Sequence, residues 1–183
     1  MEKPSAGDAG RPSLTLRRHY RVSPDKLWRA WTDPQALKLW FGPGEIVSVP
    51  IAEVDLRVGG RFRVAMLADD GETHDVSGTY LEVVPERKLV FSWAWHSTPE
   101  RESRVTLRIE PDADGCELVL IHEQFFDQAA RDAHEHGWSG ALVKLQGWLS
   151  RRLAEADPGA AALPQRLPNP ILGFPRRDHR SLP

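Results

Sequence analysis

Apolar residues recur at helical spacing in the longest amphipathic stretch of the chain, which runs from Gly137 to Leu153. One face of this stretch carries positions i, i+3, i+4 and i+7 of the pattern, namely Trp138, Ala141, Leu142, Leu145, Trp148, Leu149 and Leu153. Each tryptophan can bury roughly 150–250 Å², so this face needs a large apolar partner. The pattern predicts a long C-terminal helix, continuing to Ala156, that lies across a curved sheet.

Between residues 45 and 123 the pattern changes to a period of two, which is typical of strands with one buried face. Val47, Val49 and Ile51 begin this pattern. Turn signals separate its runs: Gly59-Gly60, expected to form a two-residue hairpin, Asp69-Asp70-Gly71, Pro85-Glu86-Arg87 and Asp112-Ala113-Asp114-Gly115. Because each link is short, neighbouring strands are expected to pair antiparallel as a meander of six strands.

A strand and two short helices are expected before the meander. Alternation over residues 14–20 predicts the strand. Ser23-Pro24-Asp25 then has the order of an N-cap serine, a first-turn proline and an acid, which is typical of a helix start. Asp33-Pro34 ends this helix and begins a second one that runs through Trp40.

The two ends of the chain lack a periodic pattern. Residues 1–12 are rich in Pro, Gly, Ser and Ala, and residues 157–183 are rich in proline. We therefore expect a disordered N-terminal tail at 1–12, one domain at 13–156 and a proline-rich tail at 157–183.

Length, charge and composition narrow the function classes. The 183 residues suit one domain with tails, and 40% of hydrophobic residues is enough for a core. A net charge of −2 shows no excess of basic residues of the kind that indicates nucleic-acid binding. No stretch has the length of a membrane helix, the N-terminus lacks a signal-peptide apolar region, and Cys116 has no second cysteine to pair with. A soluble cytoplasmic protein without membrane insertion is expected.

Several stretches, taken in order, resemble a known family. They are Val22-Ser23-Pro24, Trp28 to Pro34, Trp40-Phe41-Gly42-Pro43, Asp55 to Gly60, Gly71, Gly78-Thr79-Tyr80, Leu89 to Trp93, and Gly137-Trp138 with the leucines that follow. No single motif is specific, but their order and spacing resemble the START-like (SRPBCC) superfamily, and within it the homologues of the activator of the heat-shock protein 90 ATPase. The resemblance implies an α+β helix-grip fold in β-α-α-β6 order, with a curved antiparallel sheet wrapped around the long C-terminal helix.

The same resemblance implies a function. In this superfamily a cavity between sheet and helix carries lipids, polyketides, hormones and other apolar molecules, so a small apolar or aromatic ligand is expected, with no cofactor. A minority of members are enzymes, such as aromatase/cyclases. The namesake co-chaperones combine this domain with an N-terminal domain for which the chain has no room. A chaperone-accessory or other partner-binding role is therefore a further alternative.

The inner face of the sheet and the apolar face of the long helix supply the candidate cavity residues. They are Trp28, Trp31, Phe62, Met66, Tyr80, Phe91, Trp93, Leu107, Leu120, His122, Trp138, Leu142 and Leu145. The alternative for each is plain core packing, in which case a buried indole N–H still needs a hydrogen-bond partner.

His122 is the candidate polar group of this face, because alternation places it with Leu118 and Leu120. A neutral imidazole there can orient a ligand carbonyl or act as a general acid or base. The alternative is a structural histidine, hydrogen-bonded within the protein. His134 and His136 lie two residues apart on a helix and point to different faces, so no metal site is expected.

The far side of the long helix carries small residues. At about 100° per residue, Gly140, Val143 and Gly147 fall away from the apolar face. Glycine inside an exposed helix costs about 1 kcal/mol relative to alanine, so the two glycines need an explanation. One explanation is close approach by another backbone, and the other is neutral drift of the sequence. A homodimer, or a contact with the tail, is the partner that this face predicts. Val119 and Ile121, on the outer face of the last strand, favour such a covered surface.

Overall fold

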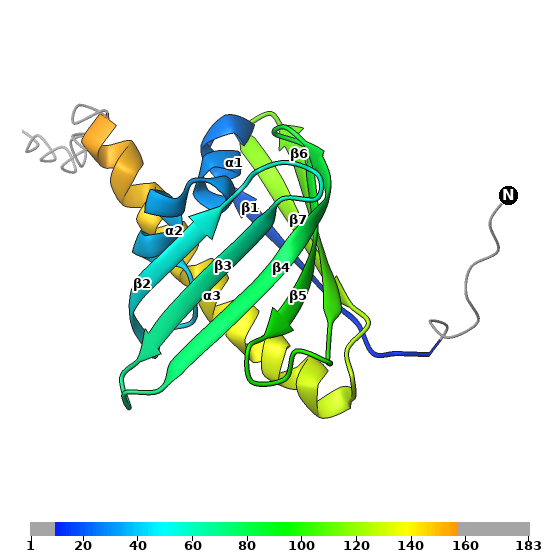
Figure 1. Cartoon of the computed structure of the whole chain (residues 1–183). Helices are drawn as coiled ribbons and strands as arrows, with labels where there is room; N and C mark the ends of the chain where they lie inside the picture. The colour runs from blue at the N-terminus through cyan, green and yellow to red at the C-terminus, as the bar shows by residue number, and fades with distance from the viewer. Residues whose placement is uncertain (1–9, 157–183) are drawn as a thin grey trace, which may run out of the picture.

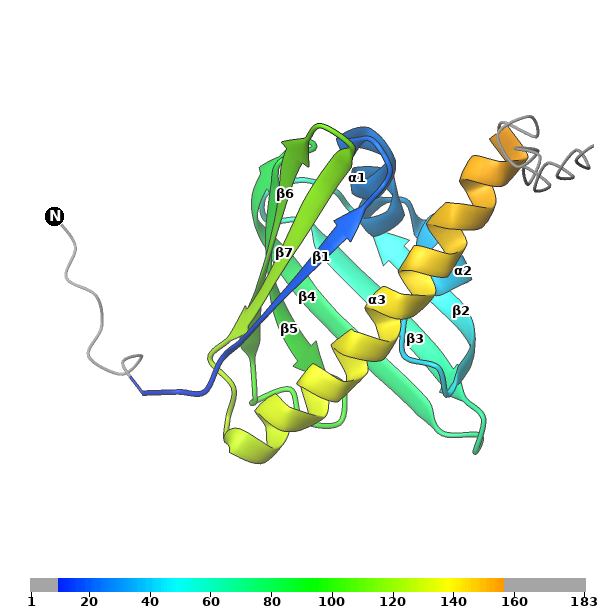
Figure 2. The same cartoon turned by 180° about the vertical axis from the view of Figure 1, so that it is seen from behind.

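A single sheet of seven antiparallel strands curls around the long helix α3 (Gln128–Ala156), as Figure 1 shows. This computed structural model describes residues 10–156. The helix crosses the concave face of the sheet (Figure 2). The predicted α+β helix-grip architecture, in the order strand, two helices, six strands and long helix, is confirmed.

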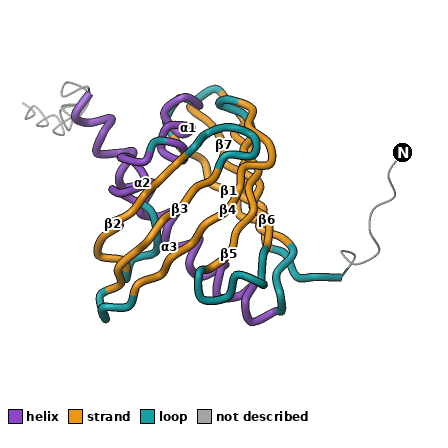
Figure 3. The backbone as a smooth tube through the Cα atoms, in the orientation of Figure 1, coloured by secondary structure: helices purple, strands orange, loops and turns teal. Residues whose placement is uncertain are grey.

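The sheet is a meander of six strands with the first strand of the chain added beside β7. The strands are β1 (Leu14–Tyr20), β2 (Ile46–Val54), β3 (Arg61–Ala68), β4 (Thr73–Val84), β5 (Lys88–Trp95), β6 (Ser103–Asp112) and β7 (Gly115–Glu123). Their order across the sheet is β1-β7-β6-β5-β4-β3-β2, so β1 pairs with β7, from Leu14 opposite His122 to Tyr20 opposite Cys116. Loops gather at the two ends of the strands (Figure 3), which leaves the concave face free for α3.

Two short helices, α1 (Pro24–Thr32) and α2 (Pro34–Trp40), lie beside the C-terminal part of α3 (Figure 1). Ser23 occupies the N-cap of α1 as predicted, but its side chain makes no capping hydrogen bond. Asp33 does cap α2, since its Oδ1 accepts from the backbone N–H of Gln35 at 2.8 Å. Trp40 Nε1 donates to the carbonyl oxygen of Ala30 at 2.9 Å and so ties the two helices together.

Strand β2 departs from the predicted alternation. The pairing of β2 with β3 shifts register twice, between Ile46 and Ser48 and again between Ser48 and Ile51. Each such irregularity turns the following side chains to the other face. Val47 is therefore 63% exposed, and Ile46, Val49 and Ala52 are the buried residues of this strand.

The predicted two-residue hairpin at Gly59-Gly60 is wrong. The link between β2 and β3 spans residues 55–60, because β2 ends at Val54 and β3 begins at Arg61. Gly59 has a φ of +81°, which favours glycine. A Cβ on Gly60 would lie 2.0 Å from the carbonyl oxygen of Asp55, so the loop folds back too tightly for a side chain.

Helix α3 is one continuous element of 29 residues that begins after Asp127. Asp127 caps this helix, since its Oδ1 accepts from the backbone N–H of Ala130 at 2.7 Å. Its apolar face packs on the sheet through residues that are at most 4% exposed, namely Trp138, Ala141, Leu142, Leu145 and Leu149. Trp148 and Leu153 extend the face but are only partly buried.

The far side of α3 is not uniform. Val143 is 68% exposed, as predicted. Gly140, in contrast, faces the loop after α2, because a Cβ there would lie 3.1 Å from Cβ of Pro43. Near Gly147 the closest atom to such a Cβ is Arg151 Nη1 at 3.5 Å. The close backbone approach at Gly140 thus comes from this chain, which removes that residue as a reason to expect a dimer or a tail contact.

Val119 on the outer face of β7 is also covered from within the chain, whereas Ile121 is only half-buried. Val119 is fully buried although it faces outward. Its partners in the register are Arg17 on β1 and Arg108 on β6, and the aliphatic stems of arginines can cover apolar surface. Val119 therefore needs no second molecule to shield it.

The predicted tails lie largely outside the described residues, which exclude 1–9 and 157–183. The described end of the N-terminal segment makes specific contacts. Arg11 Nε donates to the carbonyl oxygen of Phe125 at 3.1 Å, and Phe125 N–H donates to the carbonyl oxygen of Pro12 at 3.2 Å. These bonds place the first contacts of the domain ahead of the predicted boundary at residue 13.

Candidate functional site

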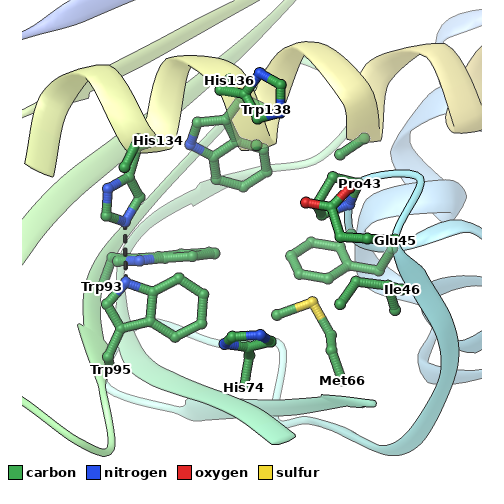
Figure 4. Close-up of a pocket in the computed structure, with 15 residues that line it drawn as sticks. Pro43, Glu45, Ile46, Met66, His74, Trp93, Trp95, His134, His136 and Trp138 are labelled. Atoms are coloured by element: carbon green, nitrogen blue, oxygen red, sulfur yellow. Dashed lines mark hydrogen bonds between the residues drawn. The ribbon is translucent and has the colours of Figure 1, made fainter. Parts of the chain in front are cut away.

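A pocket of about 260 Å³ opens between the sheet, helix α3 and the loop after α2 (Figure 4). The sheet contributes Met66, His74, Trp93 and Trp95; α3 contributes Ala133, His134, His136, Gly137, Trp138 and Ala141; the loop and the start of β2 contribute Phe41, Gly42, Pro43, Glu45 and Ile46. Most of these side chains are apolar or aromatic. A concave apolar site with few polar groups is the usual form of a small-molecule site.

Tryptophan rings form much of the wall. The centroids of Trp93 and Trp138 lie 5.1 Å apart, and those of Trp93 and Trp95 lie 5.4 Å apart at an interplanar angle of 85°. Phe41 meets Trp138 edge-on at 6.0 Å. Trp93–Trp95 and Phe41–Trp138 are edge-to-face contacts, a favourable geometry for aromatic pairs, whereas Trp93 and Trp138 are tilted at 53°, so the wall is held in shape by its own rings.

His134 fastens Trp95 to the helix. The indole N–H of Trp95 donates to Nε2 of His134 at 3.1 Å, which makes Nε2 the acceptor (Figure 4). The proton of the neutral ring therefore sits on Nδ1, which lies 2.7 Å from the carbonyl oxygen of Ala130 and donates to it. Burial lowers the pKa of His134, in keeping with a neutral ring that uses both nitrogens.

His122 holds a second wall tryptophan. Trp138 Nε1 donates to His122 Nδ1 at 3.0 Å, so the ring proton sits on Nε2 and is donated to Ser103 Oγ at 2.8 Å. The Ser103 hydroxyl in turn donates to the carbonyl oxygen of Trp93 at 3.3 Å. The chain of bonds is complete, and every polar atom in it has a partner inside the protein.

In this geometry the described bonds of His122 are made within the protein. The side chain is fully buried, and it is not among the lining residues of the pocket. Burial and then the neighbouring His134 hold the pKa of His122 well below its ordinary value. Because both ring nitrogens are engaged, the imidazole positions Trp138 and Ser103, which is the structural alternative considered for it.

The structure distributes the other predicted cavity residues over three places. Met66, Trp93 and Trp138 line the pocket. Trp31, Phe62, Tyr80 and Phe91 surround a gap of about 20 Å³ on the other side of Trp93, which has room for little more than one water. The remaining predicted residues line neither space and belong to the packed core: Trp28, Leu107, Leu120, His122, Leu142 and Leu145.

Sequence patterns missed several residues of the pocket. Trp95 follows Trp93 by two positions and therefore shares its face, a signal that was available. His134 was considered only as a possible metal ligand together with His136. The two side chains differ in exposure, since His134 is half-buried and His136 is exposed. Pro43 belongs to a turn after the second helix and Glu45 to the start of the alternating pattern, and no local pattern indicates that their loop meets α3.

Residues 10–156 hold neither a metal-ligand cluster nor a membrane-spanning helix. Within this range no three His, Cys, Asp or Glu side chains gather as a metal site would require. No helix there is long and apolar enough to cross a membrane.

A second concavity, of about 390 Å³, lies between α1, α2 and the C-terminal part of α3. Its walls are more polar, with Lys26, Arg29 and Arg152 among the lining residues. Arg152 lies over the ring of Trp148, 5.0 Å from its centroid. None of the predicted cavity residues lines this groove.

Known proteins share this fold. The AHSA1 protein from Silicibacter pomeroyi is 31% identical, with a TM-score of 0.70 over 77% of this chain and 99% of that one. A protein from Chromobacterium violaceum is 27% identical, with a TM-score of 0.68 over 75% and 96% of the two chains. One from Nitrosomonas europaea is 27% identical, with a TM-score of 0.67 over 78% and 96%. A search of curated proteins found no match.

A family model also matches the sequence. It is described as activator of Hsp90 ATPase homolog 1-like protein, and it covers residues 21–150, which include every residue that lines the pocket. The match spans both short helices, β2 to β7 and most of α3. The chain therefore belongs to the activator of Hsp90 ATPase homolog 1-like family, with the START-like fold that its sequence pattern resembles.

Proposed function

We propose that this protein binds a small, largely apolar or aromatic molecule in the pocket between the sheet and α3. The observation that carries the proposal is the pocket itself: a space of about 260 Å³ whose wall is built from Trp93, Trp95, Trp138, Phe41 and Met66. Apolar surface left facing an open space is costly in water, and filling it with an apolar ligand recovers that free energy.

The rigidity of the wall supports the proposal. Trp95 and Trp138 are each hydrogen-bonded to a neutral imidazole, and the rings of Trp93 and Trp138 pack against each other. A pocket that is already formed loses little conformational entropy when a ligand enters. Its volume, slightly below that of sites for drug-sized molecules, favours a ligand with one or two rings.

Ala133 provides the test, because it is exposed, lies on α3 and lines the pocket. We expect Ala133→Phe to obstruct the pocket and weaken binding of an apolar aromatic probe such as naphthalene, measured by quenching of tryptophan fluorescence. The matched control is Ala129→Phe, which adds the same ring to an exposed position of the same helix outside the pocket. Native mass spectrometry of the protein purified from its source would show whether a small molecule accompanies it. Equal affinities in the two variants would contradict the proposal.

Association with heat-shock protein 90 is a second candidate function, and the family match is the observation that favours it. An ATPase assay of purified heat-shock protein 90, with and without this protein, tests the association directly. A rate that does not change at saturating concentration would argue against it. Sedimentation of the protein alone in the same buffer would report a homodimer.

A further inference from the structure

We propose that the pocket beside α3 receives an organic ammonium group, such as a trimethylammonium head, between the faces of its aromatic rings. This inference rests on the proposed function and names the chemical class of the ligand. It follows from the angles between the rings of the wall, from the sign of its charge, and from the hydrogen bonds made by His134 and Lys144.

The rings stand at steep angles to one another. Trp95 meets Trp93 at 85°, and Phe41 meets Trp138 at 89°. Rings at such angles cannot all stack on one flat ligand, but they can present faces and edges to one compact group from different sides. Figure 4 shows Trp95, Trp138 and Met66 around the same open space. The face of an indole attracts a cation within about 6 Å, and cages of such rings recognise quaternary ammonium groups.

The charge of the wall has one sign. Glu45 lines the pocket, and no lysine or arginine does so among the described residues. The Glu45 side chain extends from the loop after α2 toward the open space (Figure 4). A carboxylate or phosphate entering the pocket would meet this acid with no lysine or arginine among the lining side chains, and an unpaired charge is costly to desolvate. A cation would gain from Glu45 as well as from the rings.

His134 does not reverse this sign. His134 accepts the indole N–H of Trp95 and donates to Ala130, so it is a neutral ring in this arrangement. A protonated His134 would place an N–H against the N–H of Trp95 and lose that bond. His74 packs edge-on against Trp95, with centroids 6.2 Å apart, and so adds to the aromatic surface.

Lys144 is the lysine whose charge interacts with Glu45, and it is directed elsewhere. Its ammonium donates to the carbonyl oxygens of Pro43 and Ile46 at 3.3 and 3.2 Å. Burial lowers the pKa of Lys144, while Glu45 opposes that change. The lysine therefore holds the loop that carries Glu45, and it is not one of the residues that line the pocket.

Three probes of the same shape separate charge from size. Phenyltrimethylammonium, tert-butylbenzene and benzenesulfonate each carry a tetrahedral head on one ring, with positive, zero and negative charge. We expect the cation to bind about tenfold more tightly than the neutral isostere, and the sulfonate to bind most weakly. Isothermal titration calorimetry or tryptophan fluorescence on the full chain measures all three.

Variants then locate the effect. Glu45→Gln is expected to weaken binding of the cation severalfold and to leave tert-butylbenzene unchanged. Trp95→Leu removes one ring face and should weaken the cation more than the neutral probe. The matched control is Glu53→Gln, which removes an exposed acid of β2 that does not line the pocket. Circular dichroism confirms that each variant is folded.

The outcomes are distinct. Tighter binding of the cation, with loss in Glu45→Gln and not in Glu53→Gln, supports the inference. If tert-butylbenzene binds as tightly as the cation, the inference is overturned while the proposed apolar binding stands. Preferred binding of benzenesulfonate would overturn it as well. If no probe binds, the inference fails, and the native mass spectrum decides separately whether the protein carries another small molecule.

Discussion

Trp95 on β5 donates its indole N–H to Nε2 of His134 on α3, 3.1 Å away, and so joins the end of a strand to the helix that crosses the sheet. The bond requires a neutral imidazole, because only an unprotonated Nε2 can accept. One wall of the pocket therefore depends on the protonation state of one side chain.

Acid should destabilise the protein through this bond. The pKa of His134, and that of His122, is lower in the folded protein than its ordinary value near 6.5. Below that value the unfolded chain binds protons that the folded chain does not, so stability is complete above it and falls as the pH decreases. We expect urea unfolding at about pH 5 to show lower stability than at about pH 7.5.

Replacement of the histidine isolates its share of that change. His134→Gln keeps an acceptor for the indole and removes the titrating group, so the difference in unfolding free energy between the two pH values should shrink. His136→Gln, at an exposed position on the same helix, should leave the difference unchanged. An identical pH dependence in His134→Gln and the unmodified protein would contradict this account.

A second prediction concerns His122. His122→Phe leaves the indole N–H of Trp138 without its buried partner and removes one of the two hydrogen bonds of the Ser103 hydroxyl, which still donates to Trp93. Each buried polar group that loses its hydrogen bond costs about 1–3 kcal/mol, so the variant should lose about 2–5 kcal/mol in chemical denaturation. The indole proton resonance of Trp138 should also move. A variant as stable as the original protein would show that this bonded chain is not important for folding.

The two glycines of α3 should respond differently to alanine. Gly147→Ala meets no closer atom than the flexible end of Arg151, at 3.5 Å, so it should stabilise the helix by up to about 1 kcal/mol. Gly140→Ala places its methyl group 3.1 Å from Cβ of Pro43 and should gain less or destabilise the protein. Thermal unfolding measures both. An equal gain at the two positions would show that the Pro43 loop does not constrain Gly140.

The apolar face of α3 gives a fourth prediction. Leu145 is completely buried, so Leu145→Ala should leave a cavity and cost about 2–5 kcal/mol. Val143→Ala, two residues away and 68% exposed, serves as the control and should change stability by less than about 0.5 kcal/mol. A small effect at Leu145 would place the apolar face of the helix away from the sheet.

The fold could be predicted from the sequence because helices and strands each have their own period of apolar residues. The stripe from Trp138 to Leu149 has one buried face and predicts the helix, and alternation in β3, β6 and β7 predicts strands. The pattern failed in β2, where the register shifts leave Val47 exposed and bury Ile46 instead. Such irregularities depend on the pairing with β3, which no local alternation records.

The candidate site was harder to predict, because it is made by elements that meet only in the folded chain. Met66, Trp93 and Trp138 were found from their faces, whereas Glu45 lines the pocket only because its loop packs against Gly140 of α3. His122 was placed correctly on the inner face, but its role depends on Ser103 and Trp138. Burial can be inferred from a period, but the partner of a buried polar atom requires the tertiary structure.

The pairing of β1 with β7 has a consequence for how the chain is made. Arg17 and Glu117, which form an ion pair across these strands, are separated by 100 positions in the sequence. During synthesis β1 leaves the ribosome first and remains without its neighbour until nearly all of the meander has followed. Closing so long a loop is entropically costly, and proteins dominated by such distant pairings fold in about milliseconds to seconds. The first strand therefore spends the longest time during synthesis without its hydrogen-bonding partner strand.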